Sequence, residues 1–233
     1  PWGQLGGMVF EPGSASGQVR FPPRGLVRAV AGRVQGEGGL LVVNEVTTGM
    51  GRTGAWFGFY HYGLSPDMAA AGKGLGNGYP VSAAAFSRQT ARRLEESGFY
   101  YAQSHQNDPL GAAVAREVLA VMAEEGWVER GCQMGERFLA SLREMAGRFA
   151  CVKEVRGRGM MAAVELVRAE GIPSAREVML ALLERGYLAG YSPAGNALRF
   201  DPALTIPEPD LQGLVTSLEE VLLDICPGRS AKC

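Results

Sequence analysis

Lysine is scarce in this chain, and one lysine lies in a segment without a charged neighbour close by. Lys73, Lys153 and Lys232 are its lysines, whereas the other basic residues are arginines. Lys73 lies in Ala-Ala-Ala-Gly-Lys-Gly-Leu-Gly-Asn-Gly, and the nearest aspartate is Asp67. In an apolar pocket lined by glycine, desolvation disfavours the ammonium form, so more of the amine is nucleophilic. Lys73 is therefore a candidate for forming a Schiff base; the alternative is a lysine that binds carbonyl groups at a helix end.

A second segment with chemically useful side chains begins where a short apolar run ends. Residues 40–43 are a four-residue apolar run with the length of a buried strand, and Asn44-Glu45-Val46-Thr47-Thr48 follows it directly. Lys73 comes just after another strand candidate, residues 68–71. In open parallel sheets, ligands bind beyond the carboxyl ends of the strands. We therefore expect neighbouring strands to bring the two segments together.

Other motifs that carry chemistry are not matched. A P-loop needs a glycine five residues before its Gly-Lys pair, and that position is Asp67. The glycines around Lys73 do not follow GxGxxG, and no serine stands at the centre of GxSxG. Ser104 and His105 are adjacent in sequence, which is a poor indication of a nucleophile and its base. The two histidines and four cysteines lack short ligand spacings, so we expect no metal site.

Composition points to an ordinary globular protein. The 233 residues carry a formal net charge of −1, which argues against a nucleic-acid partner or a polybasic membrane surface. No apolar run reaches the roughly 20 residues of a membrane helix. The four cysteines include no CxxC pair, and we interpret them as reduced thiols of a cytoplasmic protein. The chain opens at Pro1-Trp2-Gly3, without a methionine or a basic leader, so we expect no signal peptide and a processed chain or a fragment.

The elements that would position these residues can be predicted from the apolar patterns. Strands are expected at residues 8–10, 40–43, 68–71, 81–86, 160–166 and 198–200, and helices at 23–35, 89–96, 175–185 and 209–223. Helical patterning also dominates residues 110–148, with a break near Gly126. The first strand, helix and strand suggest a βαβ unit and a parallel sheet. Arg156-Gly-Arg-Gly159 introduces a final stretch that is predicted to run β-α-β-α.

These elements predict an α/β fold with two parts and a helical connection between them. Residues 1–110 are expected to form part of a larger domain with a mostly parallel sheet and helices. Residues 111–150 form the helical connection, and residues 151–233 form a small C-terminal α/β domain. No internal repeat is found.

Five segments in order along the chain stand out: VNEVTTGMGRTG (43–54), FGFYHYGLSPD (57–67), GKGLGNGYP (72–80), HQNDPLGAA (105–113) and LRFDPALTI (198–206). Together they resemble the class III aminotransferases, which are fold-type I transferases that use pyridoxal 5'-phosphate. The resemblance runs from about residue 9 to residue 223. It implies the second half of the large cofactor domain followed by the small C-terminal domain.

The resemblance implies a role for five residues toward the cofactor. Lys73 matches the lysine that forms the Schiff base and moves the proton. Asn44 stands where the family has an aspartate that pairs with the pyridine nitrogen, and Val46 matches the residue that packs on one face of the ring. Thr47 stands where the family usually has a glutamine that contacts the phenolic oxygen. Ser104 falls at the position of a threonine that binds the phosphate across a dimer interface.

The resemblance also implies two residues for the substrate. Arg199 matches an arginine that binds the substrate α-carboxylate in many members. Glu11 matches a glutamate that pairs with this arginine in several members. Three of the residues named for the cofactor or the substrate also have a simpler interpretation: Ser104 as a turn residue, Arg199 as a surface charge and Glu11 as a loop acid. Arg52 and Thr53 are interpreted as residues that shape a loop.

Asn44 departs from the family pattern in its charge. An aspartate keeps the pyridine nitrogen protonated, and the resulting cation acts as the electron sink. A neutral asparagine can form a hydrogen bond but supplies no charge, and each pKa unit corresponds to about 1.4 kcal/mol. We therefore expect slow or altered chemistry, which Asn44→Asp should accelerate.

The chain is also short for the family, whose members run to roughly 400 residues or more as the resemblance implies. The segments that would carry the phosphate-binding loop and the aromatic residue stacked on the cofactor ring are not in this sequence. Glycine-rich loops and helix N-termini supply much of the phosphate affinity in such sites. Low affinity for the cofactor is therefore expected.

Three functions are consistent with the sequence. The first is transamination between an amino donor and a 2-oxo acid, in a homodimer with the site at the interface. The second is another pyridoxal-phosphate reaction, a racemase or aminomutase step, which Asn44 favours because a weaker electron sink can change the fate of the carbanion. The third is a catalytically inactive fragment or pseudoenzyme that binds a partner.

Overall fold

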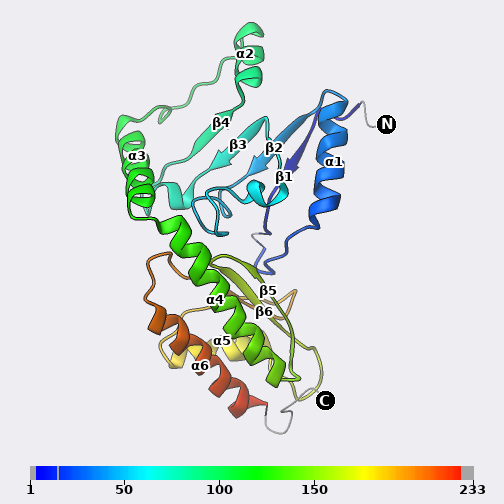
Figure 1. Ribbon diagram of the computed structural model, residues 1–233, viewed down its shortest axis with the longest axis vertical. Helices are drawn as coiled ribbons and strands as arrows, with labels where there is room; N and C mark the ends of the chain where they lie inside the picture. The colour runs from blue at the N-terminus through cyan, green and yellow to red at the C-terminus, as the bar shows by residue number, and fades with distance from the viewer. Residues whose placement is uncertain (1–3, 15, 227–233) are drawn as a thin grey trace. The chain divides into compact units, whose positions relative to one another are not determined.

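The computed structural model describes residues 4–14 and 16–226 and contains two compact units (Figure 1). Unit 1 comprises residues 1–13, 22–50 and 55–128, and unit 2 comprises residues 14–21, 51–54 and 129–233. Each unit is therefore assembled from discontinuous segments of the chain. Each consists of a sheet with helices, as the predicted α/β class requires. No helix in the described ranges is long and apolar enough to cross a membrane.

The sheet of unit 1 has four strands in chain order. They are β1 (Gly7–Phe10), β2 (Leu40–Asn44), β3 (Met68–Ala71) and β4 (Ala83–Phe86). The first three strands are parallel, and β4 is antiparallel to β3. The mostly parallel sheet is as predicted. The direction changes at β4 because residues 72–82 return without the long helical crossover that a parallel neighbour requires.

One face of this sheet is covered by α1 (Arg24–Gly36). Its buried Val27 and Ala31 pack against Leu41 and Val43 of β2, together with Phe10 and Tyr62. Strand β4 differs, because all four of its residues are exposed. Val9 of β1 is 78% exposed. Within the described part of unit 1, the sheet therefore has a core on the side of α1, whereas apolar residues of β4 and β1 are exposed to solvent.

The remaining elements of unit 1 begin and end at recognisable residues. They are the short 3-10 helices η2 (Gly58–Tyr62) and η3 (Lys73–Leu75), and the helices α2 (Arg88–Glu96) and α3 (Pro109–Glu124). Asp108 caps α3 by accepting a hydrogen bond from the Leu110 amide. The predicted break near Gly126 is confirmed, since Gly126 has a φ of +67° and the next helix starts one residue later.

The sheet of unit 2 is antiparallel throughout, with the order β5-β6-β8-β7. Its strands are β5 (Val152–Arg158), β6 (Met161–Leu166), β7 (Gly190–Ser192) and β8 (Ala197–Phe200). Strands β6 and β8 were predicted, whereas β5 and β7 were not. The predicted order β-α-β-α is wrong, because a second strand pairs beside each predicted one.

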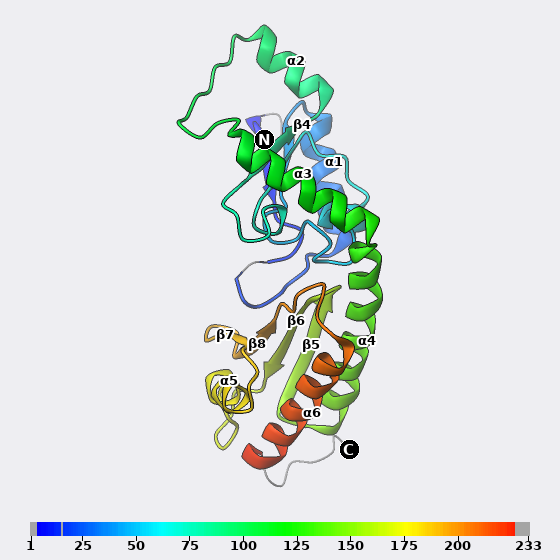
Figure 2. The same ribbon diagram turned by 90° about the vertical axis from the view of Figure 1, so that its left-hand side faces the viewer.

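Strand β6 is buried along its whole length because both of its faces are covered. Ala162, Val164 and Leu166 face the core that α4 (Trp127–Arg148), α5 (Ala175–Glu184) and α6 (Glu208–Ile225) build, and Figure 2 shows the last three helices around the sheet. Met161 and Ala163 alternate with them and pack against the fully buried Val19. Unit 2 thus has a continuous core of its own.

The turn between β5 and β6 lies directly against α4. A Cβ atom on Gly135 of α4 would lie 2.3 Å from the carbonyl carbon of Gly159. Gly159 has a φ of +57°, and its own added Cβ would lie 2.3 Å from the Gly54 amide nitrogen. Only residues without side chains permit this approach. The segment of residues 51–54 is thereby held to unit 2.

Candidate active site

The segments that follow β2 and β3 meet at one edge of the unit 1 sheet. Asn44 is the partner of Ala70 in the register of the two strands, and the Glu45 amide donates to the Ala70 carbonyl at 2.8 Å. Lys73 Nζ donates a hydrogen bond to Thr47 Oγ1 at 2.9 Å. The two segments are therefore brought together, as the predicted neighbouring strands require.

The backbone around Lys73 adopts a conformation that side chains rarely allow. Lys73 has a φ of +47°, and Met50 in the loop after β2 has a φ of +55°. A Cβ atom on Gly74 would lie 3.3 Å from Met50 Cβ, so the two segments are in contact here as well. A non-glycine residue in this region costs about 1–3 kcal/mol, and such residues cluster at functional sites. The geometry therefore supports a functional role for this edge.

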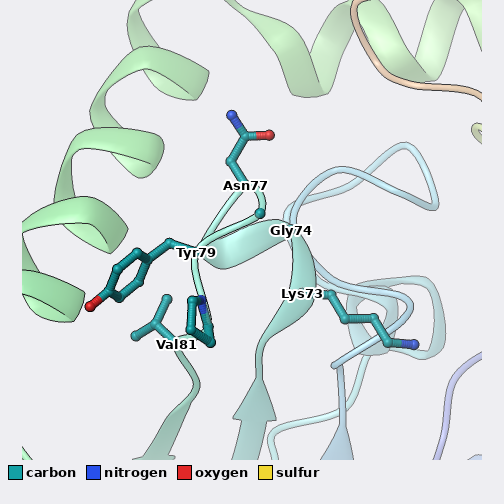
Figure 3. A pocket seen from close by; sticks show the side chains of 7 residues that line it. Lys73, Gly74, Asn77, Tyr79 and Val81 are labelled. Atoms are coloured by element: carbon teal, nitrogen blue, oxygen red, sulfur yellow. The ribbon is translucent and has the colours of Figure 1, made fainter.

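The Lys73 amine does not lie in the apolar, glycine-lined pocket expected from the sequence. An open pocket of about 410 Å³ adjoins the segment, and the side chain of Lys73 extends away from Tyr79 (Figure 3). Lys73 itself is exposed. Unit 1 places no second layer over this edge within its described residues. The pocket is lined by Lys73, Gly74, Asn77, Gly78, Tyr79, Pro80 and Val81.

Asn44 and Val46 are linked by a hydrogen bond at the end of β2. The Val46 amide donates to Asn44 Oδ1 at 3.1 Å. Because that amide is a donor, the atom facing it must be the side-chain oxygen, and the Nδ2 group is left to donate elsewhere. Val46 is half-buried, and its Cγ1 would lie 3.7 Å from a Cβ on Gly72, the residue before Lys73. Both residues therefore belong to the same edge as Lys73.

Glu45 is a residue that the sequence interpretation overlooked. Its side chain is 1% exposed, and Oε2 accepts hydrogen bonds from Thr48 Oγ1 at 2.7 Å and from the Gly58 amide at 2.9 Å. Oε1 accepts from the Phe59 amide at 2.8 Å. Burial raises the pKa of the Glu45 carboxyl group, and these three bonds oppose the rise. Glu45 thus fixes the loop that carries Val46 and Thr47; an acid directly after an apolar strand was the available signal.

Glu11 and Ser104 belong to unit 1 but have different surroundings. Glu11 directly follows β1, so it lies at the carboxyl edge of the same parallel strands. Ser104 is exposed in the long loop between α2 and α3, which Figure 2 shows extending from the ends of both helices. Its hydroxyl group makes no hydrogen bond within the described residues. The phosphate role of Ser104 stays a prediction.

Arg199 lies on β8 in unit 2 and forms a two-pronged ion pair. Its Nε is 2.5 Å from Asp201 Oδ2, and its Nη2 is 3.2 Å from Oδ1. Arg52, also in unit 2, donates to the carbonyl oxygens of Met160, at 2.9 Å, and Pro202. Burial lowers the pKa of the Arg52 guanidinium, and nearby Asp201 opposes that change. Arg52 shapes a loop, as interpreted, and the acid beside Arg199 was overlooked.

Comparison of the sequence with models of protein families identifies the family of this chain. The model described as aminotransferase class-III matches residues 3–222. The chain belongs to the class-III aminotransferases. This family depends on pyridoxal phosphate, and its chemistry agrees with an amine at the carboxyl edge of parallel strands.

Individual relatives support the same assignment. The chain is 37% identical to the taurine–pyruvate aminotransferase of Rhodobacter capsulatus over 170 residues, which is 70% of this chain and 37% of that protein. It is 34% identical to the ornithine aminotransferase of Bordetella pertussis over 223 residues, covering 95% of this chain and 52% of that one. The chain therefore spans about half the length of the curated relatives that it matches.

Solved structures share this fold. A transaminase from the marine bacterium Virgibacillus superposes with a TM-score of 0.88 and 28% identity, covering 94% of this chain and 53% of that one. An (S)-enantioselective omega-transaminase from Thermomicrobium roseum gives a TM-score of 0.84 at 30% identity. That match covers 94% of this chain and 51% of the other. The predicted fold-type I class is confirmed.

The residues at the edge of the unit 1 sheet fit part of pyridoxal phosphate. Lys73 supplies an amine for a carbonyl carbon, and Thr47 supplies a hydroxyl group 2.9 Å from that amine. Asn44 supplies an amide donor and Val46 an apolar surface, which suit a ring nitrogen and a ring face. The part of the chain that the structure describes gathers no comparable set of donors for a phosphate at this edge. Lys73, Thr47, Asn44 and Val46 are thus the residues that would hold the cofactor.

Proposed function

We propose that this chain supplies part of the active site of an aminotransferase that moves an amino group between an amino donor and a 2-oxo acid. The observation that supports this most is the placement of Lys73 Nζ beside Thr47 at the joined ends of β2 and β3, in a class-III aminotransferase chain. Pyridoxal phosphate, when bound, supplies a carbonyl group that accepts the amino group and a ring that withdraws electrons.

The residues of this chain would divide the work as follows. Lys73 Nζ holds the cofactor covalently and takes and returns the proton at the reacting carbon of the donor. Thr47 Oγ1 orients Nζ through the hydrogen bond between them. Val46 packs against the ring face, and Asn44 donates to the ring nitrogen. Ser104 binds the phosphate of the cofactor that is held by the second subunit of the dimer.

Two further residues are assigned to the substrate. Arg199 anchors a substrate carboxylate, because a guanidinium fork matches that group with two hydrogen bonds. Glu11, directly after β1, is the second residue assigned to the substrate. Residues 1–110 contribute to the cofactor domain, and residues 151–233 form the small C-terminal domain. Residues 111–150 are the helical connection between these two domains. The protein is a homodimer with the site at its interface, and light scattering of the purified chain would check this oligomeric state. Its proposed compartment is the cytoplasm.

The first experiment asks whether Lys73 carries the cofactor. The chain is incubated with pyridoxal phosphate, its visible absorbance is recorded, and the sample is reduced with borohydride before intact-mass and peptide analysis. We expect a visible band and one added cofactor on the peptide that contains Lys73. Lys73→Arg should abolish both signals, whereas Lys153→Arg should change neither, because Lys153 pairs with Glu165 in unit 2.

The outcome separates an enzyme from an inactive fragment. Cofactor attached elsewhere, or equally in Lys73→Arg, would overturn the role of Lys73. A well-folded sample with no band and no added mass would overturn the proposal for this chain and favour the third function, a fragment or pseudoenzyme.

A second candidate function is a racemase or aminomutase reaction at the same lysine. It is favoured by Asn44, whose oxygen accepts a hydrogen bond from the Val46 amide, which leaves the Nδ2 group as a donor for a ring nitrogen. A donor favours the uncharged form of that nitrogen and therefore a weaker electron sink. Incubation of the loaded chain with one enantiomer of an amino acid discriminates the two. Racemised substrate without a keto acid would support the second function and exclude transamination.

A further inference from the structure

Arg199 and Asp201 are fixed on one side of the end of β8. Phe200 lies between them in sequence, is 4% exposed, and packs edge-to-face on Phe138 with ring centroids 6.1 Å apart. Because side chains alternate along a strand, residues 199 and 201 both point away from the core that holds Phe200. Core packing in unit 2 therefore sets the register that makes the Arg199–Asp201 pair.

The turn after Asp201 is held in place by Arg52. This guanidinium donates to the Pro202 carbonyl and, at 2.9 Å, to the Met160 carbonyl. Two backbone segments of unit 2 are thus tied to one side chain, and Asp201 is the residue directly before one of them. Arg52 is a positioning residue for Asp201, because it fixes the backbone at Pro202, the residue directly after Asp201.

The pair occupies the Nε/Nη2 edge of the Arg199 guanidinium, which is one of the two edges where a carboxylate can form two hydrogen bonds. Asp201 takes both Nε and Nη2 of Arg199, which is the fork-to-fork arrangement that carboxylates prefer. The Arg199 side chain is 16% exposed and that of Asp201 is 35% exposed, so solvent screens the pair only in part. A second carboxylate at this edge would have to replace Asp201.

We propose that Asp201 is a specificity-determining residue, an internal counter-ion that a substrate carboxylate must displace from Arg199. This inference rests on the proposed role of Arg199 as the carboxylate anchor. It implies that carboxylate-bearing substrates bind weakly at this subsite. Amino donors with an uncharged group there, such as simple amines, bind without that cost. Asp201 thus shifts the preference of the subsite from amino acids toward amines.

The test measures carboxylate binding without catalysis. The chain is labelled at arginine Nε, and the Arg199 Nε–H signal is followed by nuclear magnetic resonance while butyrate or its uncharged analogue butyramide is added. We expect Asp201→Asn to lower the dissociation constant for butyrate about tenfold and to leave butyramide unchanged. Asn keeps an oxygen acceptor for Arg199 and removes only the charge. Asp201→Ser, which removes the same charge, provides a second measurement.

The matched control is Glu208→Gln. Glu208 also accepts two bonds from one arginine of unit 2, Arg137, at 2.8 and 2.9 Å, so this variant makes the same change in net charge at another ion pair. It should leave the affinity for butyrate unchanged. In an Arg199→Gln background, read from ligand signals, Asp201→Asn should bring no gain.

Two failures are distinguishable. If Arg199→Gln weakens butyrate binding but neither Asp201 variant tightens it, the inference about Asp201 is wrong and the anchor role of Arg199 stands. If Arg199→Gln does not change butyrate binding, or no form of the chain binds butyrate, both the anchor role and the inference are overturned. Cofactor attachment at Lys73 is measured separately and is untouched by either result.

Discussion

The two units of this chain cover their sheets to very different degrees. In unit 2, β6 is buried at all six positions, between the core of α4, α5 and α6 on one face and Val19 with its neighbours on the other. In unit 1, all four residues of β4 are exposed and Val9 of β1 is 78% exposed. One sheet is enclosed within its own unit, whereas the other keeps apolar residues in solvent.

The candidate chemistry lies in the less covered unit. Lys73, Thr47 and Asn44 stand at the strand ends of unit 1, and Lys73 is exposed there. Segments with few buried apolar contacts open at low free energy. The candidate site residues of unit 1 are therefore held more by local hydrogen bonds, above all those of Glu45, than by a large apolar core.

The largest effect should come from the core of unit 2. Leu142 of α4 is 0% exposed, and Leu142→Ala should lower the free energy of unfolding by about 2–5 kcal/mol through the cavity that it leaves. The matched change in unit 1 is Leu26→Ala on α1, where the side chain is 60% exposed, and it should cost far less. Circular dichroism during urea unfolding measures both. Equal losses would contradict the exposure of Leu26 on α1.

Glu45→Gln should destabilise unit 1 by about 1–2 kcal/mol, because an amide cannot accept all three buried donors. Burial raises the folded-state pKa of Glu45 above its ordinary value of 4.5. The stability that the protonated group contributes is therefore full below pH 4.5 and is lost as pH rises through the folded-state pKa. The advantage of the wild type over Glu45→Gln should thus shrink with rising pH.

Tryptophan fluorescence follows this change selectively, since Trp56 and Trp127 belong to unit 1 and the sequence of unit 2 has no tryptophan. Urea unfolding is repeated between pH 4 and pH 8. An advantage that grows with pH would mean that the three donors outweigh burial.

Asn44→Asp should accelerate the amino-donor half-reaction of the cofactor-loaded chain by roughly tenfold, the equivalent of about 1.4 kcal/mol. The new carboxylate keeps an oxygen for the Val46 amide and adds a negative charge at the ring nitrogen. Stopped-flow absorbance measures the rate. Asn107→Asp makes the same charge change in the exposed loop before α3 and should leave the rate unchanged. Unchanged kinetics in Asn44→Asp would refute the proposed role of this residue.

Val9→Ala should have the smallest effect, below about 0.5 kcal/mol, because an exposed side chain removes little apolar area from water. Val43→Ala on the adjacent strand β2 removes the same atoms at a site that is 0% exposed and should cost more. Tryptophan fluorescence during urea unfolding compares them. A loss at Val9 as large as that at Val43 would show that the β1 side chain is covered in solution.

The fold was predictable wherever apolar periodicity acts within one element. The break at Gly126 and the three parallel strands of unit 1 are examples. Strand β5 was not predictable, because Lys153, Glu154, Arg156 and Arg158 obscure its alternation. Burial would raise the pKa of Glu165 on β6, but bonds from Lys153 and Arg156 lower it, and this pairing is what lets β5 carry charge. Sequence alone does not reveal such pairs.

The candidate site shows the same limit. The meeting of Lys73 with the segment after β2 followed from strand order, which local patterns indicate. The exposure of Lys73 depends on what covers the sheet, and the burial of Glu45 depends on amides thirteen and fourteen residues away. Asp201 could have been found, because residues two apart at a strand end share a side.

The discontinuity of the units has a consequence for how the chain emerges from the ribosome. The polypeptide passes between the units five times, after residues 13, 21, 50, 54 and 128. Val19 and Arg52 leave the exit tunnel long before Met161 and Met160, the residues that they contact in the finished fold. These early segments must wait for the carboxyl-terminal half of the chain to be synthesised. A contiguous piece that begins at residue 129 would lack both and leave part of β6 bare, so no single cut yields unit 2 intact.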